Sequence, residues 1–151
     1  MKQGFTLTEL LIVVFIAGML AAIALPQYSK SVERSRTVEV LSTARTIVDA
    51  MNRAFLTNPN VWPTTKQFLD VQVGGGQWID DSTFQTKDFV YDISGGKSLE
   101  IDRISGGEKL YHLTIYNRFS EDKHGKSICK SETDMGSYIC KTLQDSGFET
   151  R

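Results

Sequence analysis

One carboxylate, Glu9, lies five residues after Gly4 and at the edge of an apolar run from Leu10 to Leu25. An ionised side chain is costly in hydrocarbon, so an acidic residue inside a membrane-length segment is a candidate functional residue. The alternative is a carboxylate at the headgroup level of a plain anchor helix. The neighbouring residues favour the first interpretation.

No arrangement of side chains in the sequence predicts catalysis. His112 falls on an expected strand beside Thr114, and His124 precedes Gly125 in an expected loop. No serine or cysteine has a histidine at a recognisable catalytic spacing. Three consecutive glycines, residues 74–76, lack the strand before and the helix after that a phosphate-binding loop requires. We therefore predict no enzyme activity, no catalytic residue and no cofactor.

Cys129 and Cys140 are the only cysteines, and both follow the apolar segment. This arrangement predicts one disulfide formed in an oxidising compartment, and closing so short a loop contributes about 3 kcal/mol. Neither histidine lies at a metal-ligand spacing from the thiols. The nearby acids lack the regular oxygen spacing of a calcium loop; they are Asp122, Glu132 and Asp134. No metal site is predicted.

The element that must carry Glu9 is a helix of membrane length. Residues 5–25 hold no other charge, and at about 1.5 Å per residue they span roughly the 30 Å of a bilayer core. The flank, residues 1–4, is short and has one basic side chain, unlike an ordinary secretory signal. No loop signal follows before Asn58, so one helix is expected to continue to Thr57.

The first 30 residues resemble the type IV pilin-like family, which includes the pseudopilins of type II secretion. The match is the run Gly4-Phe5-Thr6-Leu7-Thr8-Glu9-Leu10-Leu11, followed by the apolar block, Gly18 and Pro26. The resemblance implies that a membrane peptidase removes a leader of residues 1–4 by cutting after Gly4. Phe5 would then be the new amino terminus, N-methylated by the same enzyme.

Glu9 has a physical role in that family context. The resemblance implies that subunits leave the membrane and pack their apolar helices in a filament core, where an unpaired carboxylate costs several kcal/mol. The terminal ammonium of a neighbour's Phe5 can neutralise it. Because one axial stagger brings the two groups together, we expect the pair to set subunit register.

Gly18 and Pro26 bracket the part of the apolar helix with the lowest helix propensity. The family resemblance implies that this stretch can melt within the filament, and a fixed kink in a membrane anchor is the alternative. The sequence leaves both interpretations open.

Beyond Pro26 the helix becomes amphipathic, over residues 26–57. Apolar side chains at alternating spacings of three and four predict one buried face, formed by Leu41, Ala44, Val48, Met51 and Phe55 and widened by Val40 and Ile47. Residues 58–87 are rich in turn formers and are expected to connect this helix to an antiparallel sheet in residues 88–151. Its expected strands are Phe89–Ser94, Leu99–Ile104 and Leu110–Tyr116. The predicted class is α+β, the type IV pilin fold, with the strand face that bears Tyr91 and Ile101 on the helix and with Glu100 and Asp102 in water.

The region between the cysteines, residues 129–140, is similar to the surface-exposed D-region loop that a carboxyl-terminal disulfide bounds in pilins. This favours a pilin or minor pilin over the major secretion pseudopilin. The formal net charge of −1 argues against nucleic acid as the main partner. Four lysines near the cysteines support only a weak nucleic-acid hypothesis; they are Lys123, Lys126, Lys130 and Lys141.

Two functions from different classes remain. The first is a structural subunit of a type IV pilus or related pseudopilus, held as a single-pass protein in the inner membrane before assembly into a homopolymeric or mixed filament at the cell surface or in the periplasm. Its implied partners are the prepilin peptidase and the pilus assembly machinery. The second is a monomeric membrane-anchored or secreted binding domain.

Overall fold

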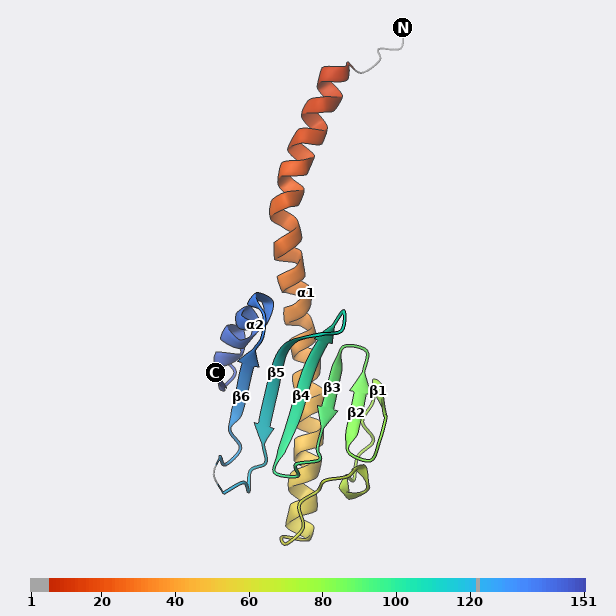
Figure 1. Cartoon of the computed structure of the whole chain (residues 1–151), viewed down its shortest axis with the longest axis vertical. Coiled ribbons are helices and arrows are strands. Elements are labelled where there is room, and N and C mark those ends of the chain that lie inside the picture. The colour runs from red at the N-terminus through yellow and green to blue at the C-terminus, as the bar shows by residue number, and fades with distance from the viewer. Residues whose placement is uncertain (1–5, 122) are drawn as a thin grey trace. The chain divides into compact units, whose positions relative to one another are not determined.

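The computed structural model of the chain describes residues 6–121 and 123–151 (Figure 1). These residues form two compact units, one ending at Arg36 and the other running from Thr37 to Arg151. Helix α1, Leu7–Thr57, belongs to both, because the division falls within it. The expectation of one helix that continues past the apolar block is confirmed.

In the first unit, α1 passes through Gly18 and Pro26 without a break. Proline cannot donate to the preceding turn, so the helix loses one hydrogen bond there. The hydroxyl of Ser29 donates to the carbonyl oxygen of Leu25 at 3.2 Å, next to this gap. The helix therefore keeps its winding at the two positions where the sequence indicates low helix propensity.

The second unit contains a seven-stranded sheet in the order β1-β2-β3-β4-β5-β6-β7. Each neighbouring pair is antiparallel except β6 and β7, which are parallel. The strands are β1 Gly76–Trp78, β2 Thr83–Thr86, β3 Phe89–Asp92, β4 Ser98–Ser105, β5 Glu108–Tyr116, β6 Ser127–Ser131 and β7 Phe148–Thr150. The expected meander is confirmed as β3, β4 and β5.

The core of this unit lies between α1 and one face of the sheet. The helix contributes fully buried residues at spacings of three and four, namely Val40, Ala44, Ile47 and Met51. The sheet contributes the expected face, with Phe89, Tyr91, Ile93, Leu99 and Ile101 all buried in the same cluster. Burying each large apolar side chain stabilises the fold by about 1.5–3 kcal/mol, so this contact fixes the second half of α1 on the sheet.

The connecting region, residues 58–87, holds more structure than the sequence indicates. Besides a single 3₁₀ turn at Lys66–Phe68, where one short helical turn was expected, it contains β1 and β2. A β-carbon at Gly76 would lie 2.2 Å from the carbonyl oxygen of Gln85, so this strand needs a glycine at its contact with β2. A three-residue strand that begins with glycine has no alternating pattern to detect.

The carboxyl-terminal part also differs from the expected loop. Residues after β6 form helix α2, Asp134–Gln144, and β7 then pairs with β6. Thr133 caps α2, since its hydroxyl oxygen accepts from the backbone N–H of Gly136 at 3.1 Å. A β-carbon at Gly136 would lie 2.1 Å from the carbonyl oxygen of Leu110, so the glycine allows α2 to pack closely on β5.

Candidate functional site

The amino-terminal end of α1 is a reciprocal cap made by Thr6 and Glu9. The backbone N–H of Thr6 donates to Glu9 Oε2 at 2.8 Å, and the hydroxyl of Thr6 donates to the same oxygen at 2.7 Å. In return the backbone N–H of Glu9 donates to Thr6 Oγ1 at 3.3 Å. This is a capping box, in which two backbone N–H groups that lack helical partners are satisfied by side chains. Thr6 was not among the residues predicted from the sequence, although the spacing T-x-x-E is the signal of this cap.

Gly4 and Phe5, the expected cleavage and methylation residues, lie outside the described residues. Among the described residues, the carboxylate of Glu9 has one hydrogen-bond partner, Thr6. Thr6 is a neutral donor. No described residue of this segment supplies a positive charge that would balance the carboxylate.

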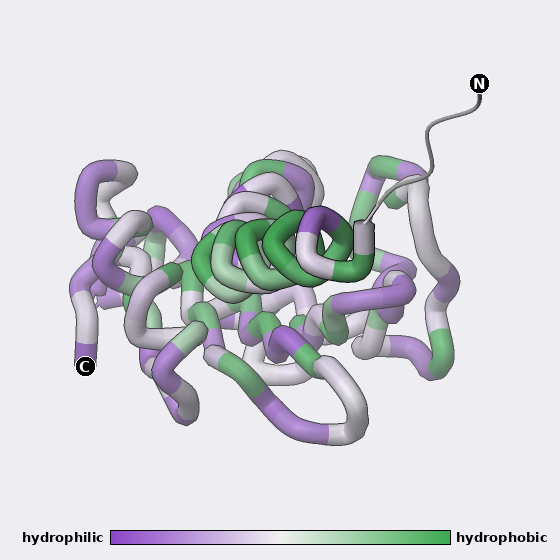
Figure 2. Tube along the Cα trace, turned by 90° about the horizontal axis from the view of Figure 1, so that it is seen from above, coloured by the Kyte–Doolittle hydropathy of each residue, from purple (hydrophilic) through white to green (hydrophobic). Residues whose placement is uncertain are grey.

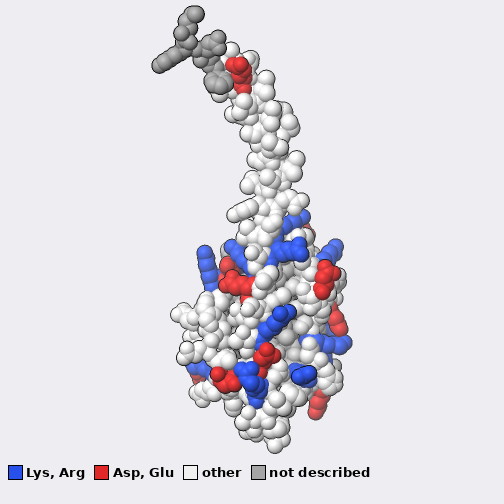
Figure 3. Space-filling view, turned by 180° about the vertical axis from the view of Figure 1, so that it is seen from behind, with Lys and Arg blue, Asp and Glu red and all other residues white. Residues whose placement is uncertain are grey.

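The segment 7–25 is an exposed apolar surface. The exposed fractions of its large side chains range from 49 % for Ile16 to 86 % for Leu7. Viewed along the helix, these turns are largely hydrophobic on all sides (Figure 2), and the segment is almost free of charge from behind (Figure 3). Among the residues that the structure describes, one helix is long and apolar enough to cross a membrane. A surface of this kind in water indicates an interaction with lipid or protein.

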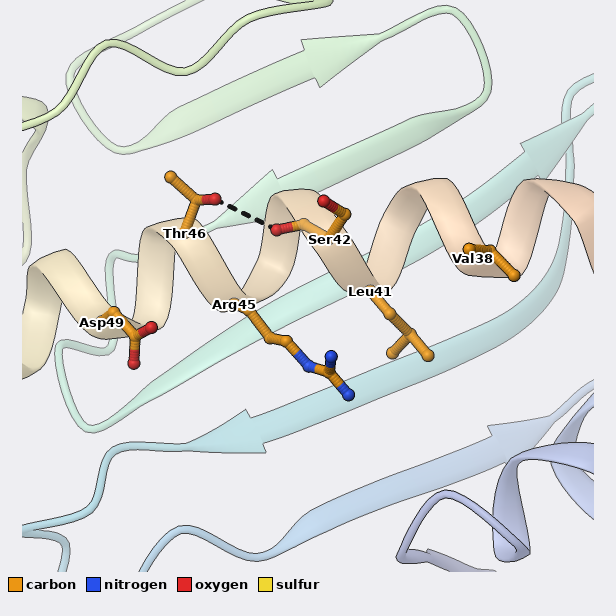
Figure 4. A pocket seen from close by; sticks show the side chains of 6 residues that line it. All are labelled: Val38, Leu41, Ser42, Arg45, Thr46 and Asp49. Atoms are coloured by element: carbon orange, nitrogen blue, oxygen red, sulfur yellow. Dashed lines mark hydrogen bonds between the residues drawn. The ribbon is translucent and has the colours of Figure 1, made fainter.

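The solvent-facing side of α1 in the second unit carries a shallow hollow of about 470 Å³. Arg45 and Leu41 extend from the same side of the helix, and the hydroxyl of Thr46 donates to the carbonyl oxygen of Ser42 at 3.1 Å (Figure 4). Val38, with 69 % of its surface exposed, is also at this hollow. The face mixes apolar and charged groups and holds no convergent set of catalytic residues.

The predicted disulfide joins Cys129 to Cys140, with their Cα atoms 5.5 Å apart. Cys129 lies in β6 and Cys140 in α2, and both are buried in the core cluster. The bond therefore fastens α2 to the sheet. The intervening residues form a strand end and a helix that packs on β5, rather than the exposed loop expected from the resemblance.

A cluster of charged and polar side chains covers the other face of β4 and β5. His112 Nδ1 lies 2.7 Å from Asp102 Oδ1, and His112 Nε2 lies 2.6 Å from Glu100 Oε2. Lys109 Nζ pairs with Asp102 at 2.6 Å, and the hydroxyl of Thr114 donates to Glu100 at 2.7 Å. Glu100 and Asp102, which the sequence predicted to lie in water, are therefore half-buried, and both are hydrogen-bonded within the cluster.

This geometry favours the imidazolium form of His112, because each ring nitrogen then donates to a different carboxylate. The hydrogen bond to Glu100 raises the pKa of His112, and burial opposes it only in part. Burial alone would raise the pKa of Glu100, but the hydrogen bonds from His112, Thr114 and Ser98 hold it below its usual value. The same holds for Asp102, where burial is outweighed by Lys109 and His112.

The cluster is not a metal centre. Within residues 6–121 and 123–151, no group of three or more His, Cys, Asp and Glu side chains could hold a metal ion. Asp122, one of the three acids considered for calcium, lies outside the described residues. The cluster instead ties β4 to β5 across a register in which Asp102 faces His112 and Glu100 faces Thr114.

Known proteins are similar to this chain over nearly its whole length. A family model described as the prokaryotic N-terminal methylation motif matches residues 1–25. A type IV major fimbrial protein, FimA of Dichelobacter nodosus, is 45 % identical over 148 residues, which cover 94 % of this chain and 88 % of the relative. Another FimA of that organism is 28 % identical over 154 residues, covering 99 % and 94 %.

The type IV major pilin protein PilE of Neisseria gonorrhoeae is 40 % identical over 63 residues, which cover 42 % of this chain and 37 % of the relative. The two FimA proteins therefore match the sheet as well as the helix, whereas PilE matches a shorter part.

Proposed function

Because the chain belongs to the type IV pilin family, we propose that it is a major structural subunit of a type IV pilus. The relatives that it matches almost end to end carry the names of major fimbrial proteins. Those names favour a pilus over a secretion pseudopilus, and they favour the filament shaft over a rare tip component. The observation that carries the proposal is the exposed apolar segment 7–25 with its single carboxylate.

We further propose that the chain is made as a precursor. A membrane peptidase removes residues 1–4 by cleavage after Gly4 and methylates the new terminal nitrogen of Phe5. The match of residues 1–25 to a methylation motif supports this step. Before assembly the subunit is held in the inner membrane by residues 5–25, while residues 26–57 continue the helix outside the bilayer. Residues 58–87 connect to the sheet, and residues 88–151 carry its central strands and the disulfide.

In the filament, Glu9 exchanges its neutral partner for a charged one. Thr6 satisfies the hydrogen-bonding capacity of the carboxylate but not its charge. Removal of the leader creates an ammonium group at Phe5, and the same group on a neighbouring subunit can neutralise Glu9 in the apolar core. An ion pair that forms at only one stagger sets the register between copies.

Gly18 and Pro26 have a separate role in this proposal. Both are tolerated inside the continuous helix of the single chain. Because glycine and proline lower helix stability by about 1 and 3 kcal/mol, the stretch between them is the first to unwind when subunits pack. We therefore expect this stretch to unwind during pilus growth or extension.

A substitution at Glu9 tests the assembly step. Glu9→Val should leave the protein in the membrane and abolish its recovery in sheared filaments, whereas the matched control Ile12→Val should assemble normally. Intact-mass analysis of native protein should show loss of residues 1–4 and one added methyl group. Normal filaments from Glu9→Val would refute the register role, and native protein that retains residues 1–4 and never polymerises would refute the pilin function itself.

A further inference from the structure

Positive charges follow the apolar segment of α1 closely. No charged residue lies between Glu9 and Lys30, and Lys30, Arg34 and Arg36 then come within seven residues. Before the apolar segment the only basic residue is Lys2. Basic residues beside a membrane span usually gather on its cytoplasmic side, so an excess on the other side points to a separate interaction. We propose that Lys30 and Arg34 bind the phosphate groups of anionic phospholipids in the outer leaflet of the inner membrane, an inference that rests on the membrane storage proposed above.

Helix geometry places both cations within reach of the lipid headgroups. The headgroup region adds about 5–8 Å on each side of the hydrocarbon core. Lys30 comes five residues after Leu25, the end of the apolar run, which is about 7.5 Å along the helix axis. Arg34 lies about 6 Å farther along, and since helical side chains tilt toward the N-terminus, its long side chain can reach back toward the membrane. Tyr28, with 70 % of its surface exposed, lies between Leu25 and Lys30, and tyrosine is enriched at this boundary.

The two cations lie on one stripe of the helix. They are four residues apart, which makes them neighbours on successive turns. Arg34 is exposed, and Lys30 is partly exposed. The one acid in residues 26–36 is Glu33, whose side chain is 6 % exposed and pairs with Arg36 at 3.1 Å. Because Arg36 balances the charge of Glu33, this part of the helix keeps a net positive charge.

The chemistry of the stripe suits a lipid phosphate. A guanidinium donates two parallel hydrogen bonds to a phosphate group, and an ammonium binds it as a point charge. Gln27 and Ser31 lie three residues before Lys30 and Arg34, both are exposed, and both can donate further hydrogen bonds. The stripe continues directly from the segment proposed to lie in the bilayer. A lipid headgroup is therefore the anion that every stored subunit meets at this depth.

Electron paramagnetic resonance of spin-labelled lipids tests the proposal on the full chain in phosphatidylcholine vesicles. The motionally restricted fraction is compared for labelled phosphatidylglycerol and labelled phosphatidylcholine with the same acyl chains. We expect phosphatidylglycerol to associate about fivefold more strongly, the effect of one basic residue near an anionic lipid surface. At about 1 M salt, where the Debye length is only about 3 Å, most of this preference should disappear.

The double variant K30Q/R34Q should lose most of the preference for phosphatidylglycerol. The matched control is R45Q, which removes an exposed arginine about three turns farther along α1 and should keep the preference. Arg36 is left unchanged because it forms an ion pair within the helix. Lys2 is present in every variant, so its contribution cancels in the comparison. Circular dichroism checks the helix, and R34Q alone serves if the double variant loses helical signal.

Vesicle flotation separates this inference from the proposed function on which it rests. A chain that does not float with the vesicles would contradict membrane storage and the inference with it. Three results from a chain that does float would overturn the inference alone: equal association of the two labelled lipids, a preference that survives in K30Q/R34Q or at high salt, or an equal loss in R45Q. The cations would then be assigned to a protein partner instead of lipid.

Discussion

The two parts of helix α1 place apolar side chains in opposite environments. Residues 7–25 are the more apolar, yet the large side chains among them are about half exposed or more. Residues 37–57 carry many charges, yet Val40, Ala44 and Ile47 are fully buried. Apolar content therefore does not predict burial within one chain. The sheet covers the second stretch, whereas the first exposes an apolar surface of the kind that interacts with lipid or protein.

The largest expected effect tests this contrast directly. Ile101→Ala removes a fully buried side chain from the sheet face under α1 and should lower the free energy of unfolding by about 3 kcal/mol. Leu11→Ala removes an exposed one and should change it by less than about 0.5 kcal/mol. Urea unfolding of the full chain in micelles, followed by the fluorescence of Trp62 and Trp78, measures both. A large loss for Leu11→Ala would mean that the first stretch is part of the folded core.

Removing the disulfide should have the next largest effect. The double variant C129A/C140A removes the cross-link between β6 and α2, whose cysteines are 11 residues apart in the sequence. The free energy of unfolding should fall by about 3 kcal/mol, because the unfolded chain gains entropy without the cross-link. The loss is expected in the second unit alone. Hydrogen exchange should therefore show weaker protection of α2 and β7, with unchanged protection of residues 7–25.

A smaller effect is expected at the start of α1. Thr6→Ala removes the hydroxyl that caps the helix and should cost about 1 kcal/mol of local helix stability. Thr6→Ser keeps the hydroxyl and should behave as the parent chain does. Hydrogen exchange of the first-turn amides in micelles measures fraying, and equal protection in both variants would show that the cap contributes nothing there.

The smallest effect is a pH dependence confined to the second unit. The pKa of His112 is raised in the folded chain by its hydrogen bond to Glu100, so its contribution is complete below the unfolded value near 6.5 and is lost as pH rises through the folded value. For a half-exposed cluster we expect a loss of under about 1 kcal/mol between pH 6 and 9.

His112→Gln should flatten this dependence, and His124→Gln is the control. Two charged residues of the neighbouring strands are paired in register with the cluster: Asp92 on β3 lies opposite Glu100, and Lys130 on β6 lies opposite His112. An unchanged slope in His112→Gln would show that the dependence does not arise from His112.

The sequence predicts the long helix, its buried stripe, the central strands and the cysteine pair, because each has a periodic or compositional signal. It does not predict β1, β2, α2 or β7. Gly76 belongs to a run of three glycines that indicates a turn, and Gly136 lies where no element was expected, but each is needed because another backbone passes close to it. The cluster around His112 is also hidden, since its members are brought together by strand register rather than by spacing along the chain.

Strands β1 and β7, at the two edges of the sheet, are each only three residues long. An edge this short offers few unpaired backbone groups to another chain. A protein made in many copies, and proposed to be held side by side in one membrane, runs a constant risk of unwanted sheet-to-sheet joining. Short outermost strands lower this risk, because they leave little edge backbone with which another copy could pair.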